Sequence, residues 1–134
     1  MVTVVCGPIG AGKTTWAKEN FENVTDRDEL GSKEAQLVRT WELWRGGYSV
    51  AHVTCMPTAE EREFFSDVLR DEVRYVWVNT TEEQCRRNIL KRGRARDLKD
   101  LDETLRRNRE LIQTAARSGL PWMFVDLFPT GERW

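Results

Sequence analysis

A short run near the start of the chain combines glycines, a lysine and a threonine at the spacing that binds phosphate groups. It fits the pattern G-x-x-x-x-G-K-[ST] at every fixed position, as Gly7-Pro8-Ile9-Gly10-Ala11-Gly12-Lys13-Thr14. The glycines allow backbone N–H groups to close around a β-phosphate, the lysine can reach the β- and γ-oxygens, and the threonine hydroxyl can bind Mg²⁺. We therefore expect ATP and Mg²⁺ to bind here, with Lys13, Thr14 and the following Thr15 among their contacts.

Two kinds of charged residue further along the chain suit the transfer of a phosphoryl group. A carboxylate in Asp26-Arg27-Asp28 can accept the proton of an attacking hydroxyl group. Positive charge on the far side of the γ-phosphate can come from a mobile, arginine-rich turn. The basic cluster that we assign to this turn comprises Arg86, Arg87, Lys91, Arg92, Arg94 and Arg96. Its alternative interpretation is a solvated helix end, where the helix dipole favours arginine.

The residues at the end of the third apolar run help to distinguish kinases from other nucleotide-binding proteins. P-loop ATPases and GTPases hold their magnesium ion with an aspartate at the end of a core strand. This run ends His52-Val53-Thr54-Cys55, without a carboxylate. The pattern favours a kinase over a motor or a switch.

Short apolar runs alternate with helical patterns along the whole chain. We predict strands at residues 2–6, 21–24, 48–54, 73–78 and 122–126, and helices at 13–21, 33–44, 57–70, 82–92 and 99–118, with an arginine-rich turn at 93–96. The phosphate-binding run follows the first strand and opens the first helix, which favours phosphate binding over an ordinary glycine turn. This order predicts an α/β fold with a parallel sheet covered on both faces, and functional loops at the carboxyl ends of the strands.

The composition indicates one small cytoplasmic domain. The 134 residues are 40% apolar, which suffices for a single core, so we expect one domain over 1–134. With 21 basic and 22 acidic residues the net charge is −1, and no overall positive field would attract nucleic acid or a membrane. The three cysteines form no C-x-x-C pair, which indicates reduced thiols. We also find no signal-peptide pattern and no run approaching the roughly 20 apolar residues of a membrane helix.

Over nearly its whole length the chain resembles the 5′-hydroxyl polynucleotide kinase domains of phage and repair enzymes, which belong to the adenylate-kinase-like P-loop kinases. Four segments carry the resemblance: the phosphate loop with Thr15-Trp16-Ala17, Asp26-Arg27-Asp28-Glu29, Pro57-Thr58-Ala59-Glu60-Glu61-Arg62 and Arg87-Asn88-Ile89-Leu90-Lys91-Arg92-Gly93. Only the phosphate loop is specific by itself, and the other three contribute through their order and spacing.

The resemblance implies a P-loop NTPase fold: a five-stranded parallel sheet flanked by helices, with the first strand near its centre and a small lid at about 86–98. It implies that Asp28 is the general base, with Asp26 as the second candidate. Arg92 takes the place of the transition-state arginine, helped by Arg94 or Arg96, and Arg94 is also expected on the ATP phosphates.

Two departures from the family pattern bear on the acceptor. Kinases of that family carry an arginine where this chain has Gly31, and an aspartate where it has Thr54. The arginine would contact the acceptor phosphate. We expect a kinase acting on the 5′-hydroxyl of a polynucleotide, DNA or RNA, or of a nucleoside-like acceptor. A kinase of small metabolites or nucleotides, and a slowly hydrolysing nucleotide-binding switch, are the alternatives.

Several other residues have ordinary interpretations. Trp41 and Trp44 could stack on bases, but aromatic residues at helical spacing more often pack in a core. His52, the only histidine, is expected as a packed ring, and Cys6 and Cys55 as small apolar fillers. The segment 126–131 follows the last strand, where kinases of the resembled group often hold adenine, and is otherwise a plain chain end.

Overall fold

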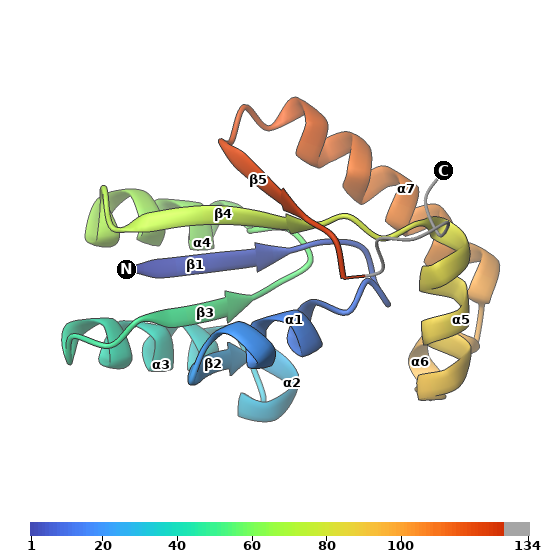
Figure 1. Cartoon of the computed structure of the whole chain (residues 1–134), viewed down its shortest axis with the longest axis horizontal. Coiled ribbons are helices and arrows are strands. Elements are labelled where there is room, and N and C mark those ends of the chain that lie inside the picture. Colours follow the sequence, from blue (N-terminus) through green and yellow to red (C-terminus); the bar gives the residue numbers. More distant parts are fainter. Residues whose placement is uncertain (128–134) are drawn as a thin grey trace.

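The structure is a computed structural model, and the residues that it describes are 1–127. Its centre is one sheet of five parallel strands in the order β2-β3-β1-β4-β5 (Figure 1). The strands are β1 (Val2–Cys6), β2 (Asn23–Asp26), β3 (Val50–Val53), β4 (Val73–Val78) and β5 (Trp122–Val125). The helices are α1 (Lys13–Asn20), α2 (Arg27–Leu30), α3 (Lys33–Arg45), α4 (Ala59–Phe64), the π-helix η1 (Phe65–Leu69), α5 (Glu82–Arg92), α6 (Ala95–Leu98) and α7 (Leu101–Arg117). The predicted parallel sheet is confirmed, as is its first strand at the centre.

The central strand β1 positions the phosphate loop. All five of its residues are buried, and Val4 lies opposite His52 of β3 on one side and Tyr75 of β4 on the other. A strand of a parallel sheet that is covered on both faces is mostly apolar, and four of the five residues of Val2–Cys6 are apolar, with Thr3 as the exception. The loop that follows therefore leaves the middle of the sheet at its carboxyl edge, where ligands of open α/β sheets bind.

Helices cover both faces of the sheet. On one face Val4 packs in a cluster with Leu43 of α3, Phe65 of η1 and Ala115 of α7. On the other face, Ala17 of α1 belongs to a second cluster of small residues. Figure 1 shows α1 on the near side of the strands, with α3 and α4 behind them. The second cluster contains Val5, Val53 and Val78 from the carboxyl ends of β1, β3 and β4, so the loops at that edge rise from a packed base.

The predicted ranges of β2 and β3 begin two residues before the strands of the structure do. For β2 the predicted range was 21–24 and the observed range is Asn23–Asp26, because Phe21 ends α1 and packs its ring 6.1 Å from that of Trp16. For β3 the observed start is Val50 instead of residue 48. There Gly47 has a φ of 87° and the N–H of Tyr48 donates back to the carbonyl of Leu43 at 3.0 Å, so the chain is still turning.

The other differences concern the helices: α2 was not predicted, and several helix ends differ. The predicted helix 57–70 is α4 followed by η1, whose wider turn places the N–H of Arg70 3.0 Å from the carbonyl of Phe65. The predicted turn 93–96 contains Gly93, with a φ of 70°, and then the short helix α6. Asp100 caps α7 by accepting from the N–H of Glu103, so α7 begins at residue 101 and not at 99.

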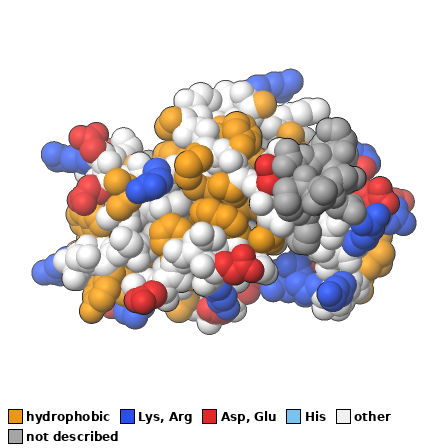
Figure 2. Space-filling model, in the orientation of Figure 1, with side chains coloured by type: hydrophobic (Ala, Val, Ile, Leu, Met, Phe, Trp, Pro, Cys, Tyr) orange, Lys and Arg blue, Asp and Glu red, His pale blue; other side chains and the backbone are white. Residues whose placement is uncertain are grey.

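Apolar side chains gather over the middle of the visible face. Figure 2 shows basic and acidic side chains around them, at the end where α5 and α6 lie and at the opposite end. Within residues 1–127 no helix combines the length and the apolar character that crossing a membrane requires.

Candidate active site

A cleft of about 880 Å³ opens at the carboxyl edge of the sheet. It brings together the phosphate loop, the segment from Asp26 to Glu29 and three lid arginines, which the sequence places far apart. The predicted residues that line it are Ile9, Gly10, Ala11, Gly12, Lys13, Thr14, Thr15, Asp26, Asp28, Arg92, Arg94 and Arg96. Gly7 and Pro8 of the predicted set do not line the cleft, but their carbonyl groups contact Lys13 beneath it.

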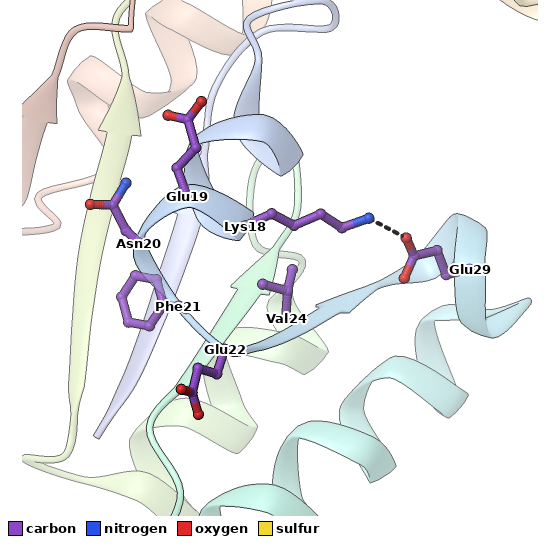
Figure 3. Close-up of a pocket in the computed structure, with 7 residues that line it drawn as sticks. All are labelled: Lys18, Glu19, Asn20, Phe21, Glu22, Val24 and Glu29. Atoms are coloured by element: carbon purple, nitrogen blue, oxygen red, sulfur yellow. Dashed lines mark hydrogen bonds and ion pairs between the residues drawn. The ribbon is translucent and has the colours of Figure 1, made fainter.

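A second hollow, of about 690 Å³, lies between the end of α1 and β2 (Figure 3). Lys18 crosses it to pair with Glu29 at 2.8 Å, while Glu19 and Glu22 point in opposite directions. Its side chains do not converge on a common point, and the phosphate loop does not line it. The cleft at the carboxyl edge is therefore the candidate active site.

The lysine of the phosphate loop is held by the loop itself. The Nζ of Lys13 donates to the carbonyls of Gly7 and Pro8, both at 2.9 Å, and lies 3.4 Å from the Sγ of Cys55. Lys13 is also the first residue of α1, and the first amides of a helix have no acceptor within the helix. An ammonium group and a helix N-terminus at one point make a site suited to phosphate oxygens.

Gly10 has a packing reason to be glycine in addition to its place in the phosphate-binding pattern. Its φ is 84°, and a Cβ there would come within 2.8 Å of both the carbonyl oxygen of Cys85 and the Cγ1 of Ile89. The backbone of the loop thus touches α5 directly. Any larger residue would have to separate the loop from this helix.

Three side chains from the second half of the chain hold the same stretch of loop. Asn108 of α7 accepts from the N–H of Ile9 at 2.7 Å and donates to its carbonyl at 2.9 Å. Asn88 of α5 donates to the carbonyl of Gly10 at 2.8 Å, and the hydroxyl of Thr80 donates to that of Ala11 at 2.7 Å. Sequence reasoning missed these contacts, because a single asparagine in a polar helix gives no signal of what it touches.

Asp26 connects β2 to the phosphate loop. One carboxylate oxygen accepts from the hydroxyl of Thr14 at 2.9 Å, and the other caps α2 by accepting from the N–H of Asp28 at 2.7 Å. Hydroxyl and carboxylate oxygens are suitable ligands for Mg²⁺. This ion usually binds one or two protein groups and completes its coordination shell with water and phosphate oxygens. Among residues 1–127 no cluster of three His, Cys, Asp or Glu residues competes for such an ion. The residues present thus fit a magnesium ion held by Thr14 and Asp26.

Asp28 lies between two lid arginines. Its carboxylate accepts from Arg94 at 2.9 Å and from Arg96 at 2.8 and 3.1 Å. The hydrogen bond from Arg96 outweighs partial burial and, with the nearby charges, holds the pKa of Asp28 below its ordinary value. Asp28 is therefore an ionised acceptor whose lone pairs are already in use.

The basic cluster predicted for the lid divides into two groups. Arg92, Arg94 and Arg96 line the cleft, and Arg92 also pairs with the buried Asp97 of α6 at 3.1 Å. The other three basic residues, Arg86, Arg87 and Lys91, lie on α5 and do not line the cleft. The solvated-helix interpretation fits this second group, and the lid interpretation fits the first.

A buried polar chain lies beneath the cleft. The hydroxyl of Thr40 is 2.8 Å from Nδ1 of His52, whose Nε2 is 2.7 Å from a carboxylate oxygen of Glu61. Side-chain exposure is 0% for His52 and 1% for Glu61. Burial by itself would raise the pKa of Glu61, but the hydrogen bonds from His52 and from the N–H of Thr58 lower it overall. His52 is thus a packed ring, as predicted, and it has no access to the cleft.

The remaining predicted residues have different outcomes. Cys6 is buried, which raises the pKa of its thiol, and it fills the core as expected. Cys55, expected as a small apolar filler near the active face, is partly buried and lines the cleft. Trp44 packs against the core, and Trp41 lies under the guanidinium of Arg45 at 5.0 Å. Most of the segment 126–131, the expected adenine contact, lies outside the described residues.

Comparisons with known proteins find the same fold in solved structures, among them two kinases. Deoxyadenosine kinase from M. mycoides with bound dATP aligns with a TM-score of 0.55 and 15% identity, covering 94% of this chain and 91% of that one. Shikimate kinase from Acinetobacter baumannii in complex with shikimate aligns with a TM-score of 0.58 and 16% identity, over 92% and 82%. YorR protein from Bacillus subtilis, in complex with phosphorylated GDP, gives 0.57 and 16%, over 94% and 85%. No protein-family model and no curated protein sequence matches the chain.

These likenesses establish the fold. The chain has an α/β, P-loop kinase-like fold with the strand order 2-3-1-4-5. At identities of 15 to 16% they carry nothing further about the reaction.

Proposed function

We propose that the protein is an ATP-dependent kinase that transfers the γ-phosphate to a hydroxyl group, with the 5′-hydroxyl of a polynucleotide or nucleoside-like molecule as the first candidate acceptor. The observation that carries the proposal is the cleft itself. A phosphate loop, two carboxylates and three arginines line one cavity, although they come from separate parts of the sequence. Phosphoryl transfer needs these groups together, because it depends on positioning and on stabilising charge.

Each group has a role in this proposal. Lys13 and the loop amides hold the β- and γ-phosphates, and Thr14 and Asp26 hold the magnesium ion, which would neutralise charge on the phosphates. Asp28 accepts the proton of the acceptor hydroxyl, and Arg92, with Arg94 or Arg96, stabilises the transferred group.

The general base has two candidates, as in the sequence interpretation. Asp28 can act once the arginines move from its carboxylate to the phosphates, which needs a shift of the lid. Asp26 requires no such shift, but its oxygens already contact Thr14 and the amide of Asp28. We keep Asp28 as the first candidate, because in this proposal Asp26 already binds the magnesium ion.

The test is transfer of labelled γ-phosphate from ATP to a panel of acceptors. The panel contains 5′-hydroxyl DNA and RNA oligonucleotides, nucleosides, nucleoside monophosphates and shikimate, each with wild type and with Lys13→Ala. We expect label on an oligonucleotide or nucleoside-like acceptor, and loss of that label with Lys13→Ala. Label on no acceptor, together with stable binding of ADP, would contradict the proposal and favour a nucleotide switch.

A small-metabolite kinase is the second candidate, and Gly31 supports it. Gly31 ends α2 with a φ of 94°, and no atom lies within 4 Å of the position where its Cβ would be. The arginine that polynucleotide kinases carry at this point is missing, and open space takes its place. Label on small acceptors alone would favour this candidate.

A further inference from the structure

The cleft has more positive than negative charge. Among the described residues that line it, eight are Lys or Arg and four are Asp or Glu. Three of the acids are paired within the cleft: Asp28 with two lid arginines, Asp97 with Arg92, and Glu29 with Lys18. The basic residues outside these pairs are Lys13, Arg27, Lys33 and Arg107.

Lys33 has hydrogen-bonding capacity that the protein does not use. It is the first residue of α3, and its Nζ forms an ion pair with an oxygen of the buried Glu61 at 3.7 Å, a distance too long for a hydrogen bond. That oxygen already accepts from the N–H of Thr58 at 3.1 Å. The side chain of Lys33 is 41% exposed and lines the cleft. An ammonium group has three donors, so a ligand in the cleft would find donors available.

Arg27 adds a second cation on the same side. It is exposed, lines the cleft as the first residue of α2, and makes no ion pair within residues 1–127. Both α2 and α3 contact β2, whereas α5 and α6 lie beyond the carboxyl ends of the strands (Figure 1). From there Arg94 and Arg96 reach Asp28 of α2. In the proposed reaction Lys13 and the lid hold the ATP phosphates, so the α2–α3 side is left for the acceptor.

We propose that Lys33, assisted by Arg27, binds an anionic group that the acceptor carries close to the hydroxyl that is phosphorylated. The inference rests on the proposed function and makes its acceptor more specific. A phosphate or a carboxylate satisfies this chemistry. A nucleotide, a polynucleotide end or a hydroxy acid is then an acceptor, and an uncharged nucleoside is a poor one.

Binding of matched acceptors tests this inference without requiring turnover. Titration calorimetry, with Mg²⁺ and a non-hydrolysable ATP analogue present, compares a nucleoside, its 3′-monophosphate, a 5′-hydroxyl dinucleotide and shikimate. We expect at least one anionic ligand to bind about tenfold more tightly than the nucleoside, the size of effect that a charge-assisted hydrogen bond gives. The phosphate and carboxylate members of the panel distinguish the two kinds of anion.

Variants of Lys33 separate a contact with the ligand from a structural role. Lys33→Met should remove the preference for the anion and leave binding of the nucleoside unchanged, and Lys33→Arg should keep the preference. Lys91→Met, on α5 outside the cleft, is the matched control. A nucleoside that binds as tightly as every anionic ligand would overturn the inference, and so would a Lys33→Met variant that weakens all ligands equally. A protein that shows the preference but transfers no phosphate would instead count against the proposed function.

Discussion

Asp28 forms ion pairs with two lid arginines, Arg94 and Arg96. The guanidinium groups of Arg94 and Arg96 are at 2.9 and 2.8 Å from its carboxylate. A triphosphate presents the same kind of oxygen to the same guanidinium groups. In the proposed reaction Asp28 and the substrate therefore compete for the lid.

Replacing Asp28 with asparagine should affect nucleotide binding and transfer in opposite directions. Asp28→Asn removes the competing charge, so we expect the affinity for ATP to rise by about threefold to tenfold. Phosphoryl transfer should fall by about a hundredfold or more, the usual contribution of a general base. Calorimetry with the ATP analogue and the transfer assay measure the two effects.

An exposed aspartate outside the cleft provides the control for this experiment. Asp67→Asn, in η1, should change neither quantity. If Asp28→Asn bound ATP no more tightly than wild type, Arg94 and Arg96 would not be phosphate ligands. If transfer were fully retained, Asp28 would not be the base and Asp26 would take its place.

Asp26 can be tested without disturbing the helix that it caps. Asparagine is as good an N-cap as aspartate, so Asp26→Asn should leave α2 in place. It removes the charge beside Thr14, and we expect the Mg²⁺ concentration for half-maximal ATP binding to rise about tenfold, as for other groups that support a metal. A magnesium titration provides the measurement, and an unchanged midpoint would exclude Asp26 from the metal site.

The sequence predicts the groups of the site better than their contacts. The order and types of Gly7 to Thr14 are enough to predict phosphate binding. The contact between Thr14 and Asp26 could not be predicted, because it depends on β2 lying two strands away from β1 in the sheet. The position of Lys33 in the cleft could not be predicted either, because it depends on the direction of α3 and not on a sequence motif.

At the scale of elements, α5 and α7 hold the phosphate loop. Asn88 and Asn108 lie on the two helices that flank the lid, and both bond to the loop backbone. A change in the position of either helix would therefore move the loop backbone as well. In this arrangement the position of the loop is coupled to that of the helices on either side of the lid.

Removing the amide of Asn108 should destabilise the protein and weaken ATP binding together. Asn108→Ala leaves the N–H and the carbonyl of Ile9 without their partner, and we expect a loss of about 2 kcal/mol in the free energy of unfolding. We also expect at least threefold weaker ATP binding, because the loop is less well positioned. Urea unfolding and calorimetry measure these changes.

A second asparagine makes a matched control. Asn20 donates to the carbonyl of Trp16 at the exposed end of α1, where water can replace it. Asn20→Ala should therefore change stability by less than about 0.5 kcal/mol. Equal effects of the two substitutions would contradict a special role for Asn108.

Element types follow from the sequence more reliably than element ends. The apolar runs and caps predict all five strands, because burial on both faces leaves few alternatives to a parallel sheet. The short helices α2 and α6 and the π-helix η1 were missed. Local propensity does not contain contacts made in three dimensions, such as that of Arg92 with Asp97 of α6.

For the whole molecule, Glu61 links stability to pH. Its hydrogen bonds hold its pKa in the folded protein below the ordinary value of 4.5. A group of this kind contributes stability that is complete above its unfolded pKa and is lost as the pH falls through the folded pKa. The contribution of Glu61 should thus be constant near neutral pH and should decrease below about pH 4.5.

Glu61→Gln isolates this contribution. We expect the variant to be less stable than wild type by about 1–3 kcal/mol at pH 7, because a buried charge-assisted contact is replaced by a weaker one. The difference between the two proteins should shrink as the pH is lowered from 5 toward 3. Urea unfolding at a series of pH values checks this, and a difference that stays constant would show that Glu61 does not titrate differently in the folded state.

The buried chain of Thr40, His52 and Glu61 also bears on how active sites are recognised in structures of unknown activity. A hydroxyl, an imidazole and a carboxylate follow one another at 2.8 and 2.7 Å, the order of the groups in a hydrolase triad, although Nδ1 faces the hydroxyl and Nε2 the carboxylate, the reverse of the triad. A search by interatomic distance would select this core before it selected the cleft. No substrate can reach the three groups, so their geometry serves the architecture of the fold, and the route from solvent has to be part of any such search.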